Sequence, residues 1–280
     1  MIGQKNLIKT FGDMIDSEGK RFPQFIILIG MKGSGRKTLS NLIYHKMNNV
    51  KFTNKFILED VKVDTIRNMI DSANRSIDNT LFIIPDADKM SVSAKNTLLK
   101  VTEEPPKNAW FILLLEDERN TLATLRSRGQ VFRIEPYSPE QIVEYARSKY
   151  ELGTDEIEII ADICEVPGEV DLLHDNGIMT MYSFVQLVIS NIAECSGSNA
   201  FKIGDKIAFK DTDKEKFDLR LFWKTFMKIC ADKLKSEGDV LKYADAVSIT
   251  SKYLQQLNIT GLNRSATFDM WILDVRESWL

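Results

Sequence analysis

The chain contains only 3 cysteines and 2 histidines among its 280 residues. Cys164, Cys195 and Cys230 stand far apart, and no two of them form a Cys-x-x-Cys pair. A disulfide framework and a structural zinc site both need several such residues at short, regular spacings. We therefore expect reduced thiols and no bound metal.

Long hydrophobic runs are also missing. Runs such as Phe25 to Ile29 are far too short to cross a bilayer. The opening residues, Met1 to Lys5, lack the apolar segment and the small-residue cleavage site of a secretion signal. The sequence thus predicts a cytoplasmic protein with no membrane partner.

An excess of positive charge is absent as well. Lys and Arg total 37 against 40 for Asp and Glu, which gives a formal net charge of -3. A protein that binds nucleic acid alone through charge is therefore disfavoured. Hydrophobic residues make up 44% and charged residues 28%, as in ordinary folded globular proteins. At about 150 residues per domain, the length suits two domains.

The first half of the sequence alternates short β-rich runs with helical patterns, which is typical of a parallel sheet with crossover helices. The expected strands are Phe25–Gly30, Phe56–Glu59, Leu81–Pro85, Trp110–Leu115 and Val131–Ile134. Some of these runs are apolar at every position, as in central strands covered on both faces. The predicted fold class is therefore α/β, a parallel sheet with flanking helices.

A helix start and a domain boundary are predicted near residue 138. Ser138 can cap the helix, Pro139 suits its first turn, and Gln141 completes a capping box. Beyond this point no strand alternation is evident, so the second half is predicted to be all-α.

Apolar side chains at three-and-four spacing mark the buried face of one helix in that second half. They are Leu219, Phe222, Trp223, Phe226, Ile229 and Cys230. Trp223, Phe226 and Trp271 are interpreted as core residues rather than interface residues.

A glycine-rich turn follows the first expected strand and opens a helix. It reads Gly30-Met31-Lys32-Gly33-Ser34-Gly35-Arg36-Lys37-Thr38. In this context backbone N–H groups and the helix N-terminus can cradle a phosphate chain. A working phosphate loop reads G-x-x-x-x-G-K-[ST], so Arg36 stands at the lysine position and Lys37 at the hydroxyl position. Arg36 can still pair with a phosphate, but position 37 has no hydroxyl for Mg²⁺.

An acidic residue follows the third expected strand. Asp86 stands where a Walker B carboxylate would hold magnesium. Ala87 occupies the position of the glutamate that orients water in an ATPase of this type, and Asp88 is interpreted as a solvated turn residue. The candidate nucleotide-binding residues are Gly30, Gly33, Gly35, Arg36, Lys37 and Asp86. Their pattern leaves ATP binding open, requires no cofactor and predicts no efficient hydrolysis.

Two further motifs carry a family resemblance. Residues Ser93–Pro106 contain the pattern N-x-L-L-K-x-x-E-E-P-P, and Thr124–Gly129 contain Ser127-Arg128-Gly129, close to S-R-C. With several shorter stretches, these make the first half of the chain resemble the bacterial DNA polymerase III clamp-loader subunits, which are AAA+ proteins, and above all the delta-prime type. The helical remainder resembles them in length and character only.

The resemblance implies a chain of three parts. They are a AAA+ P-loop-like α/β domain at 1–136, a helical lid at 137–178, and a helical C-terminal oligomerisation domain, the collar, at 179–280. In this family the collar joins the subunits into a ring.

The resemblance also implies a division of labour at the ATP sites. Arg128 corresponds to the arginine that reaches from one subunit into its neighbour's ATP site, as an arginine finger. Glu116 stands at the sensor-1 position, and Glu169 and Asp171 lie in the sensor-2 region, where an active subunit keeps neutral or basic groups. These departures predict a subunit without ATPase activity of its own, within a DNA-directed DNA polymerase holoenzyme.

The implied partners are tau- or gamma-like ATPase subunits and a delta-like subunit. The sliding clamp and primed DNA are reached through the assembly. Two other interpretations stay open: an active ATPase subunit that uses Arg36 in place of lysine, and a AAA+ adaptor that works in DNA repair.

Overall fold

The computed structural model describes residues 2–17, 22–51, 53–192, 203–209, 216–236, 240–257 and 261–279. Cys195 lies outside the described residues. The chain divides into two compact units, Met1–Tyr137 and Ser138–Leu280. This boundary falls one residue after the break expected at residue 136, and the separation of a lid from a collar at residue 178 stays a prediction.

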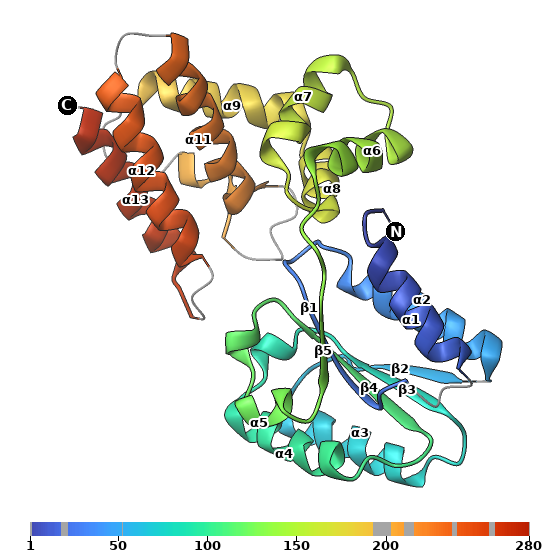
Figure 1. Cartoon of the computed structure of the whole chain (residues 1–280). Coiled ribbons are helices and arrows are strands. Elements are labelled where there is room, and N and C mark those ends of the chain that lie inside the picture. Colours follow the sequence, from blue (N-terminus) through green and yellow to red (C-terminus); the bar gives the residue numbers. More distant parts are fainter. Residues whose placement is uncertain are drawn as a thin grey trace. The chain divides into compact units, whose positions relative to one another are not determined.

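The first unit is built on a five-stranded, all-parallel sheet (Figure 1). Its strands are β1 (Phe25–Ile29), β2 (Asn54–Ile57), β3 (Thr80–Ile84), β4 (Ala109–Leu115) and β5 (Gln130–Arg133), in the spatial order β2-β3-β4-β1-β5. The three central strands are buried almost throughout, whereas the edge strands are partly or largely exposed. The five strands expected from the sequence are confirmed to within a few residues.

Helices cover both faces of the sheet (Figure 1). One layer consists of α1 (Lys5–Asp16) and α2 (Arg36–Val50), and the other of α3 (Val63–Arg75), α4 (Val92–Glu103) and the short α5 (Ala123–Arg126). Alternate side chains of β1 serve the two layers, so that Ile27 packs toward α3 and α4 while Ile26 and Leu28 pack toward α1 and α2. Two-sided burial explains why the central strands are apolar at every position.

The second unit is predominantly helical. Its helices are α6 (Pro139–Lys149), α7 (Thr154–Ile163), α8 (Pro167–Asp175), α9 (Ile178–Asn191), α11 (Leu219–Ser236), α12 (Val240–Gln256) and α13 (Arg264–Trp279). The capping box is present at the start of α6: the Ser138 hydroxyl accepts the backbone N–H of Gln141, whose side chain in turn accepts the N–H of Ser138. The helix start expected at residue 138 is therefore confirmed.

The all-α expectation for this half is wrong at one point. Two short strands, β6 (Ile207–Ala208) and β7 (Phe217–Asp218), form a small parallel sheet. Two residues are too few to show the alternation that predicts a strand, so the sequence carried no signal for this pair.

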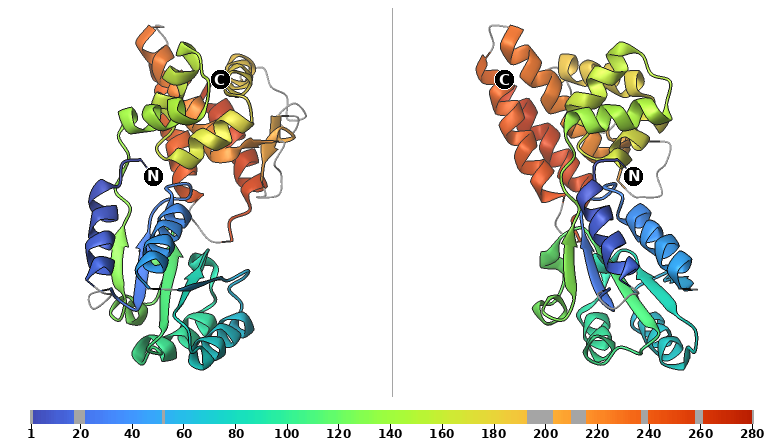
Figure 2. Two further views of the ribbon diagram at one scale, coloured as in Figure 1. Left: turned by 90° about the vertical axis from the view of Figure 1, so that its right-hand side faces the viewer. Right: turned by 45° about the vertical axis from the view of Figure 1, so that its right-hand side comes forward.

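An aromatic core holds the C-terminal helices together, and Figure 2 shows α11, α12 and α13 side by side. Trp223, Phe226 and Trp271 are fully buried, which confirms their interpretation as core residues. The rings of Phe226 and Trp271 meet edge to face at 5.0 Å, and the Trp271 Nε1–H donates to the hydroxyl of Thr250 at 2.9 Å. The expected apolar face of α11, from Leu219 to Cys230, is buried throughout.

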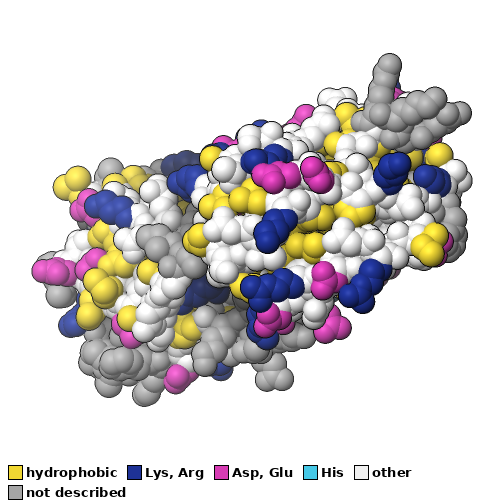
Figure 3. Space-filling view, turned by 90° about the horizontal axis from the view of Figure 1, so that it is seen from below, with side chains coloured by type: hydrophobic (Ala, Val, Ile, Leu, Met, Phe, Trp, Pro, Cys, Tyr) yellow, Lys and Arg dark blue, Asp and Glu magenta, His cyan; other side chains and the backbone are white. Residues whose placement is uncertain are grey.

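The distribution of charge on the surface agrees with the nearly equal numbers of acidic and basic residues in the sequence. On the face seen in Figure 3, side chains of both signs are interspersed among hydrophobic ones. Among the described residues, no helix is both long enough and apolar enough to cross a membrane.

Candidate functional site

The glycine-rich turn after β1 depends on two glycines with unusual backbone angles. Gly33 and Gly35 have φ values of 84° and 92°, in the left-handed region that favours glycine. The Tyr137 hydroxyl donates to the carbonyl of Ser34 at 2.8 Å and fixes the turn from outside. Helix α2 then begins at Arg36, so the first turn of that helix follows the loop as the sequence predicts.

Arg36 and Lys37, which depart from the phosphate-loop pattern, differ in their exposure to solvent. Lys37 is exposed, and so is the next residue, Thr38. The side chain of Arg36 is only 11% exposed. Arg36 is therefore the cation that this loop places inside the structure.

Arg36 is paired with acids of its own chain. Its Nη2 donates to Oε1 of Glu116 at 3.1 Å, and its Nη1 lies 3.9 Å from Oδ2 of Asp88. Nη1 is buried and has no hydrogen-bond partner among the described residues. Glu116 follows β4 and Asp88 follows β3, so the pairs join α2 to loops at the carboxyl ends of two neighbouring strands.

Asp88 holds the loop that follows β4 by several hydrogen bonds. Its carboxylate accepts the backbone N–H groups of Glu116 at 2.7 Å and of Asp117 at 3.2 Å, and the side-chain amide of Asn120 at 3.2 Å. Its side chain is only 16% exposed. The interpretation of Asp88 as a solvated turn residue is therefore wrong, because adjacent parallel strands bring the loop after β4 onto it.

Asp86 is placed differently from Asp88. It adopts a left-handed backbone conformation with φ of 52°, just before the short 3-10 helix η1 (Ala87–Lys89). Its side chain is 49% exposed and lies 3.8 Å from the ammonium of Lys89. The acids near Arg36 are thus Asp88 and Glu116, whereas Asp86, which the sequence places at the Walker B position, pairs with Lys89.

This arrangement determines what the loop can attract. One guanidinium faces two carboxylates, so the immediate charge around Arg36 sums to -1. A phosphate that approaches Arg36 meets the repulsion of both acids as well as the attraction of the arginine. Glu116 therefore opposes an anion and also occupies the cation that would bind it.

The acids of the sensor-2 region have partners within the second unit. Glu169 is buried, and its Oε1 lies 2.7 Å from the ammonium of Lys224 on α11. Asp171 accepts the hydroxyls of Tyr145 and Tyr150, each at 2.9 Å, and the ammonium of Lys149. Both carboxylates serve as internal hydrogen-bond acceptors.

These contacts shift the pKa of nearby groups. The hydrogen bond from Lys149 to the Asp171 carboxylate raises the pKa of that lysine above its usual range. Burial, reinforced by the charge of Glu169, raises the pKa of the Cys164 thiol to about 12. A thiol with so high a pKa is a poor nucleophile at neutral pH, so Cys164 is a structural residue.

Arg128 lies just after α5, on the surface of the first unit. Its Nη2 donates to Oε1 of Glu103 at 2.7 Å, and its Nη1 to the carbonyl of Thr124 at 2.9 Å. Its side chain is 35% exposed. The guanidinium is thus held by two contacts of its own unit and still reaches solvent.

Gly129 explains a departure from the S-R-C pattern. A Cβ atom at this position would lie 2.7 Å from Cδ1 of the Phe25 ring and 3.1 Å from Cδ1 of Ile27. Both side chains are buried in the core of the sheet and cannot move aside freely. A cysteine does not fit beside Phe25, and glycine is the residue that the packing allows.

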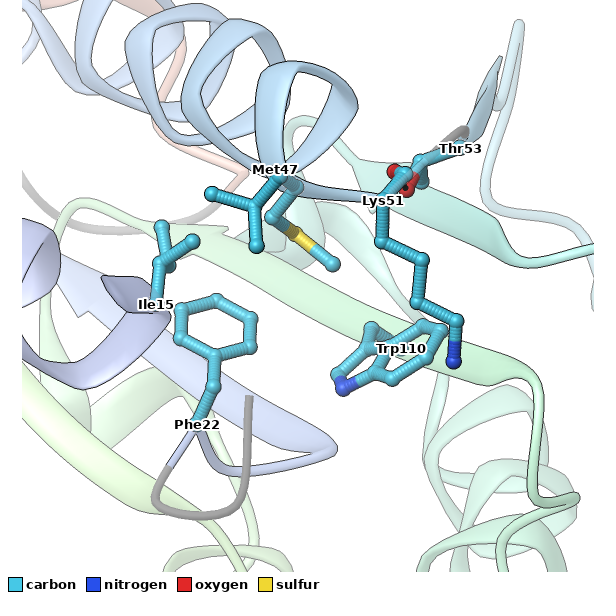
Figure 4. Close-up of a pocket in the computed structure, with 7 residues that line it drawn as sticks. Ile15, Phe22, Met47, Lys51, Thr53 and Trp110 are labelled. Atoms are coloured by element: carbon cyan, nitrogen blue, oxygen red, sulfur yellow. Dashed lines mark hydrogen bonds between the residues drawn. The ribbon is translucent and has the colours of Figure 1, made fainter. Parts of the chain in front are cut away.

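A small cavity in the first unit is excluded as a ligand site. Ile15, Phe22, Met47, Lys51, Thr53 and Trp110 surround it (Figure 4). Its volume is about 40 Å³, whereas sites for small molecules measure roughly 300–1,000 Å³.

Known proteins resemble the part of the chain that carries these residues. Residues 33–138 match the family model described as DNA polymerase III, delta subunit. The delta-prime subunit of DNA polymerase III from Haemophilus influenzae is 30% identical over 102 residues, which cover 35% of this chain and 31% of that protein. The Escherichia coli delta-prime subunit is 43% identical over 58 residues, covering 21% and 17%. Over this part of its length the chain is similar to the delta-prime subunits of the DNA polymerase III clamp loader.

The similarity extends to another subunit of DNA polymerase III. The tau subunit of DNA polymerase III from Bacillus subtilis is 25% identical over 170 residues, which cover 51% of this chain and 30% of that protein. The matched segments of the chain span about a third or less of the length of these curated relatives.

Solved structures agree on the fold over nearly the whole chain. A gamma subunit-related protein of DNA polymerase III from Thermotoga maritima superposes with a TM-score of 0.53 and 15% identity, covering 96% of this chain and 98% of that one. A point mutant of RuvB from the same organism gives a TM-score of 0.52 and 15% identity, covering 98% and 88%. The chain therefore shares its fold with these proteins: a parallel sheet with flanking helices, followed by a mostly helical region.

Proposed function

We propose that the chain is a non-hydrolysing subunit of the DNA polymerase III clamp loader. In this role it helps to load the sliding clamp on primed DNA, and it supplies Arg128 to the ATP site of a neighbouring subunit. Its direct partners are tau- or gamma-like ATPase subunits and a delta-like subunit, and the clamp and the DNA are reached through the assembly. The subunit requires no cofactor of its own. Its expected cytoplasmic location stays a prediction.

One observation carries the proposal that the chain does not hydrolyse ATP. Arg36, the cation at the lysine position, is paired with Glu116 at 3.1 Å and lies 3.9 Å from Asp88. Phosphoryl transfer needs cations and a bound Mg²⁺ to neutralise the charge of the transferring group. Here the cation is neutralised internally, and Lys37 replaces the hydroxyl that would bind the metal.

Arg128 differs from Arg36 in its exposure, which supports its role toward a partner. Among the described residues its side chain pairs with the single acid Glu103, and it is 35% exposed, against 11% for Arg36. An arginine finger accelerates phosphoryl transfer at the site it completes by about 10³–10⁵. The resemblance of the Ser127-Arg128 motif to that of clamp-loader subunits supports this role for Arg128.

The deciding experiment uses the reconstituted loader. Arg128→Ala should sharply lower the DNA-stimulated ATP hydrolysis of the complex, while its mass, measured by light scattering, stays unchanged. Arg67→Ala is the matched control, because Arg67 is an exposed arginine on α3 that pairs with Asp64 of the same helix. An unchanged rate for Arg128→Ala would remove the finger role.

The two other interpretations give different results. Turnover by the isolated chain that Asp86→Ala abolishes would indicate an active ATPase subunit. Failure to assemble with the loader's ATPase subunits would instead favour an adaptor in DNA repair.

A further inference from the structure

The backbone at Arg128 is fixed on both sides. Its N–H donates to the carbonyl of Leu125 at 3.2 Å, and Leu125 is fully buried in the core of the first unit. The next residue, Gly129, lies against the Phe25 ring. Because the backbone is fixed, the direction of the Arg128 side chain depends only on its own torsion angles and on the groups that bind its guanidinium.

Glu103 is anchored to the same core. It is the last residue of α4, which buries Leu98 and Val101 against the sheet. Its carboxylate lies at the C-terminal end of the helix, where the helix dipole adds further negative character. Glu103 and Arg128 thus project from one packed body, although they are 25 residues apart in sequence.

The contacts of the guanidinium leave part of it available. One Nη donates to Glu103 and the other to the carbonyl of Thr124. A guanidinium has five N–H donors, so two bonds hold the group and others remain for a ligand. The side chain of Glu103 is 55% exposed, and water weakens an exposed ion pair. The contact with Glu103 therefore does not prevent the Arg128 guanidinium from binding a further group.

We propose that Glu103 is a positioning residue for Arg128, holding the guanidinium in the orientation in which it enters a neighbour's ATP site. This inference rests on the proposed finger role. Glu103 touches no reacting group and acts only through the arginine. An exposed pair of this kind favours one side-chain orientation by roughly two- to fivefold.

The kinetic test compares variants of Glu103 in the reconstituted loader. Glu103→Gln removes the charge and keeps the shape, and we expect kcat for DNA-stimulated ATP hydrolysis to fall about two- to fivefold, with KM for ATP unchanged. Glu103→Asp keeps the charge on a shorter side chain and should recover part of the rate. Glu104→Gln is the matched control, since Glu104 is the adjacent exposed acid, and it should leave kcat unchanged.

A spectroscopic readout tests the contact without partners. In the isolated full chain, ¹⁵N NMR of the Arg128 side chain should show slowed guanidinium rotation, which Glu103→Gln abolishes and Glu104→Gln preserves. Equal rotation rates in all three proteins would overturn the proposal.

The outcomes separate the two proposals. If Arg128→Ala lowers kcat and Glu103→Gln does not, the positioning role is wrong and the finger role stands. A higher kcat for Glu103→Gln would show a restraining contact and would also overturn the positioning role. If Arg128→Ala itself leaves kcat unchanged, the finger role fails and the positioning role fails with it.

Discussion

The guanidinium of Arg36 and the carboxylate of Glu116 lie 3.1 Å apart and join two segments that are 80 residues apart in sequence. Glu116→Gln removes one negative charge from this contact, which lessens the repulsion of an incoming anion. A unit charge about 6 Å away changes the interaction energy by roughly 1–3 kcal/mol, so we expect affinity for ADP to rise about tenfold. Isothermal titration calorimetry on the isolated chain measures it, with Glu104→Gln as the control. Equal affinities in the variant and the wild type would contradict the blocking role of Glu116.

The tight packing at Gly129 predicts a loss of stability. Gly129→Ala places a Cβ atom against the Phe25 ring, and overpacking of this kind costs about 1–3 kcal/mol in the free energy of unfolding. Gly12→Ala is the matched control, because a Cβ there meets nothing within 4 Å and the residue lies inside α1. That control should gain about 0.5–1 kcal/mol. Urea denaturation distinguishes the two, and equal stabilities would show that the core around Phe25 yields easily.

The buried pair of Lys224 and Glu169 predicts a larger loss. Lys224→Met leaves the Glu169 carboxylate buried without its cation, which costs about 3–5 kcal/mol. Lys224→Met combined with Glu169→Leu should recover most of that loss, because no buried unpaired charge remains; Glu165, the other acid near Lys224, is 61% exposed. Lys228→Met is the control: Lys228 is 29% exposed, and its surface pairs contribute less than about 1 kcal/mol. Denaturation followed by circular dichroism compares the variants, and a double variant no more stable than Lys224→Met would contradict this account.

The contacts of Asp60, just before α3, predict that the stability of the fold depends on pH. The Thr65 hydroxyl and the Lys62 backbone N–H donate to its carboxylate and lower its pKa to about 2. Because the pKa of Asp60 is lower in the folded state than in the unfolded state, the ionised carboxylate stabilises the fold. This contribution to the free energy of unfolding is present above the unfolded pKa of about 3.9 and is lost as the pH falls toward 2.

Thr65→Val removes the main donor and should raise the pKa of Asp60 toward its unfolded value. NMR titration of the carboxyl carbon measures this pKa. Thr97→Val is the control, since the Thr97 hydroxyl donates to the carbonyl of Ser93. An unmoved Asp60 titration in Thr65→Val would show that the hydroxyl does not set the pKa.

Local and periodic features of the fold could be predicted from the sequence. The continuous apolar strands, the capping box at Ser138 and the buried face of α11 each follow from spacing over a few residues, and each is confirmed. The glycine frame from Gly30 to Gly35 also specified its own turn. In such cases the residues that determine the structure are close together in the chain.

The charge contacts of the site could not be predicted in the same way. Asp88 receives N–H groups from a loop 28 residues away, and this contact depends on the strand order, which the sequence did not specify. The pairing of Arg128 with Glu103 likewise needs α4 and α5 to pack on one face of the sheet. Such contacts arise from the tertiary arrangement, and no local pattern marks them.

The Arg36–Glu116 pair differs from a bound anion in one respect. Glu116 is part of the same chain, so it faces Arg36 at an effective concentration on the order of millimolar or higher, which dilution of the protein does not change. A free phosphate compound competes for Arg36 only when its own concentration approaches that value. The pairing of Arg36 in the first turn of α2 is therefore determined by an acid of the same chain. Changes in the concentration of small anions in solution alter it little.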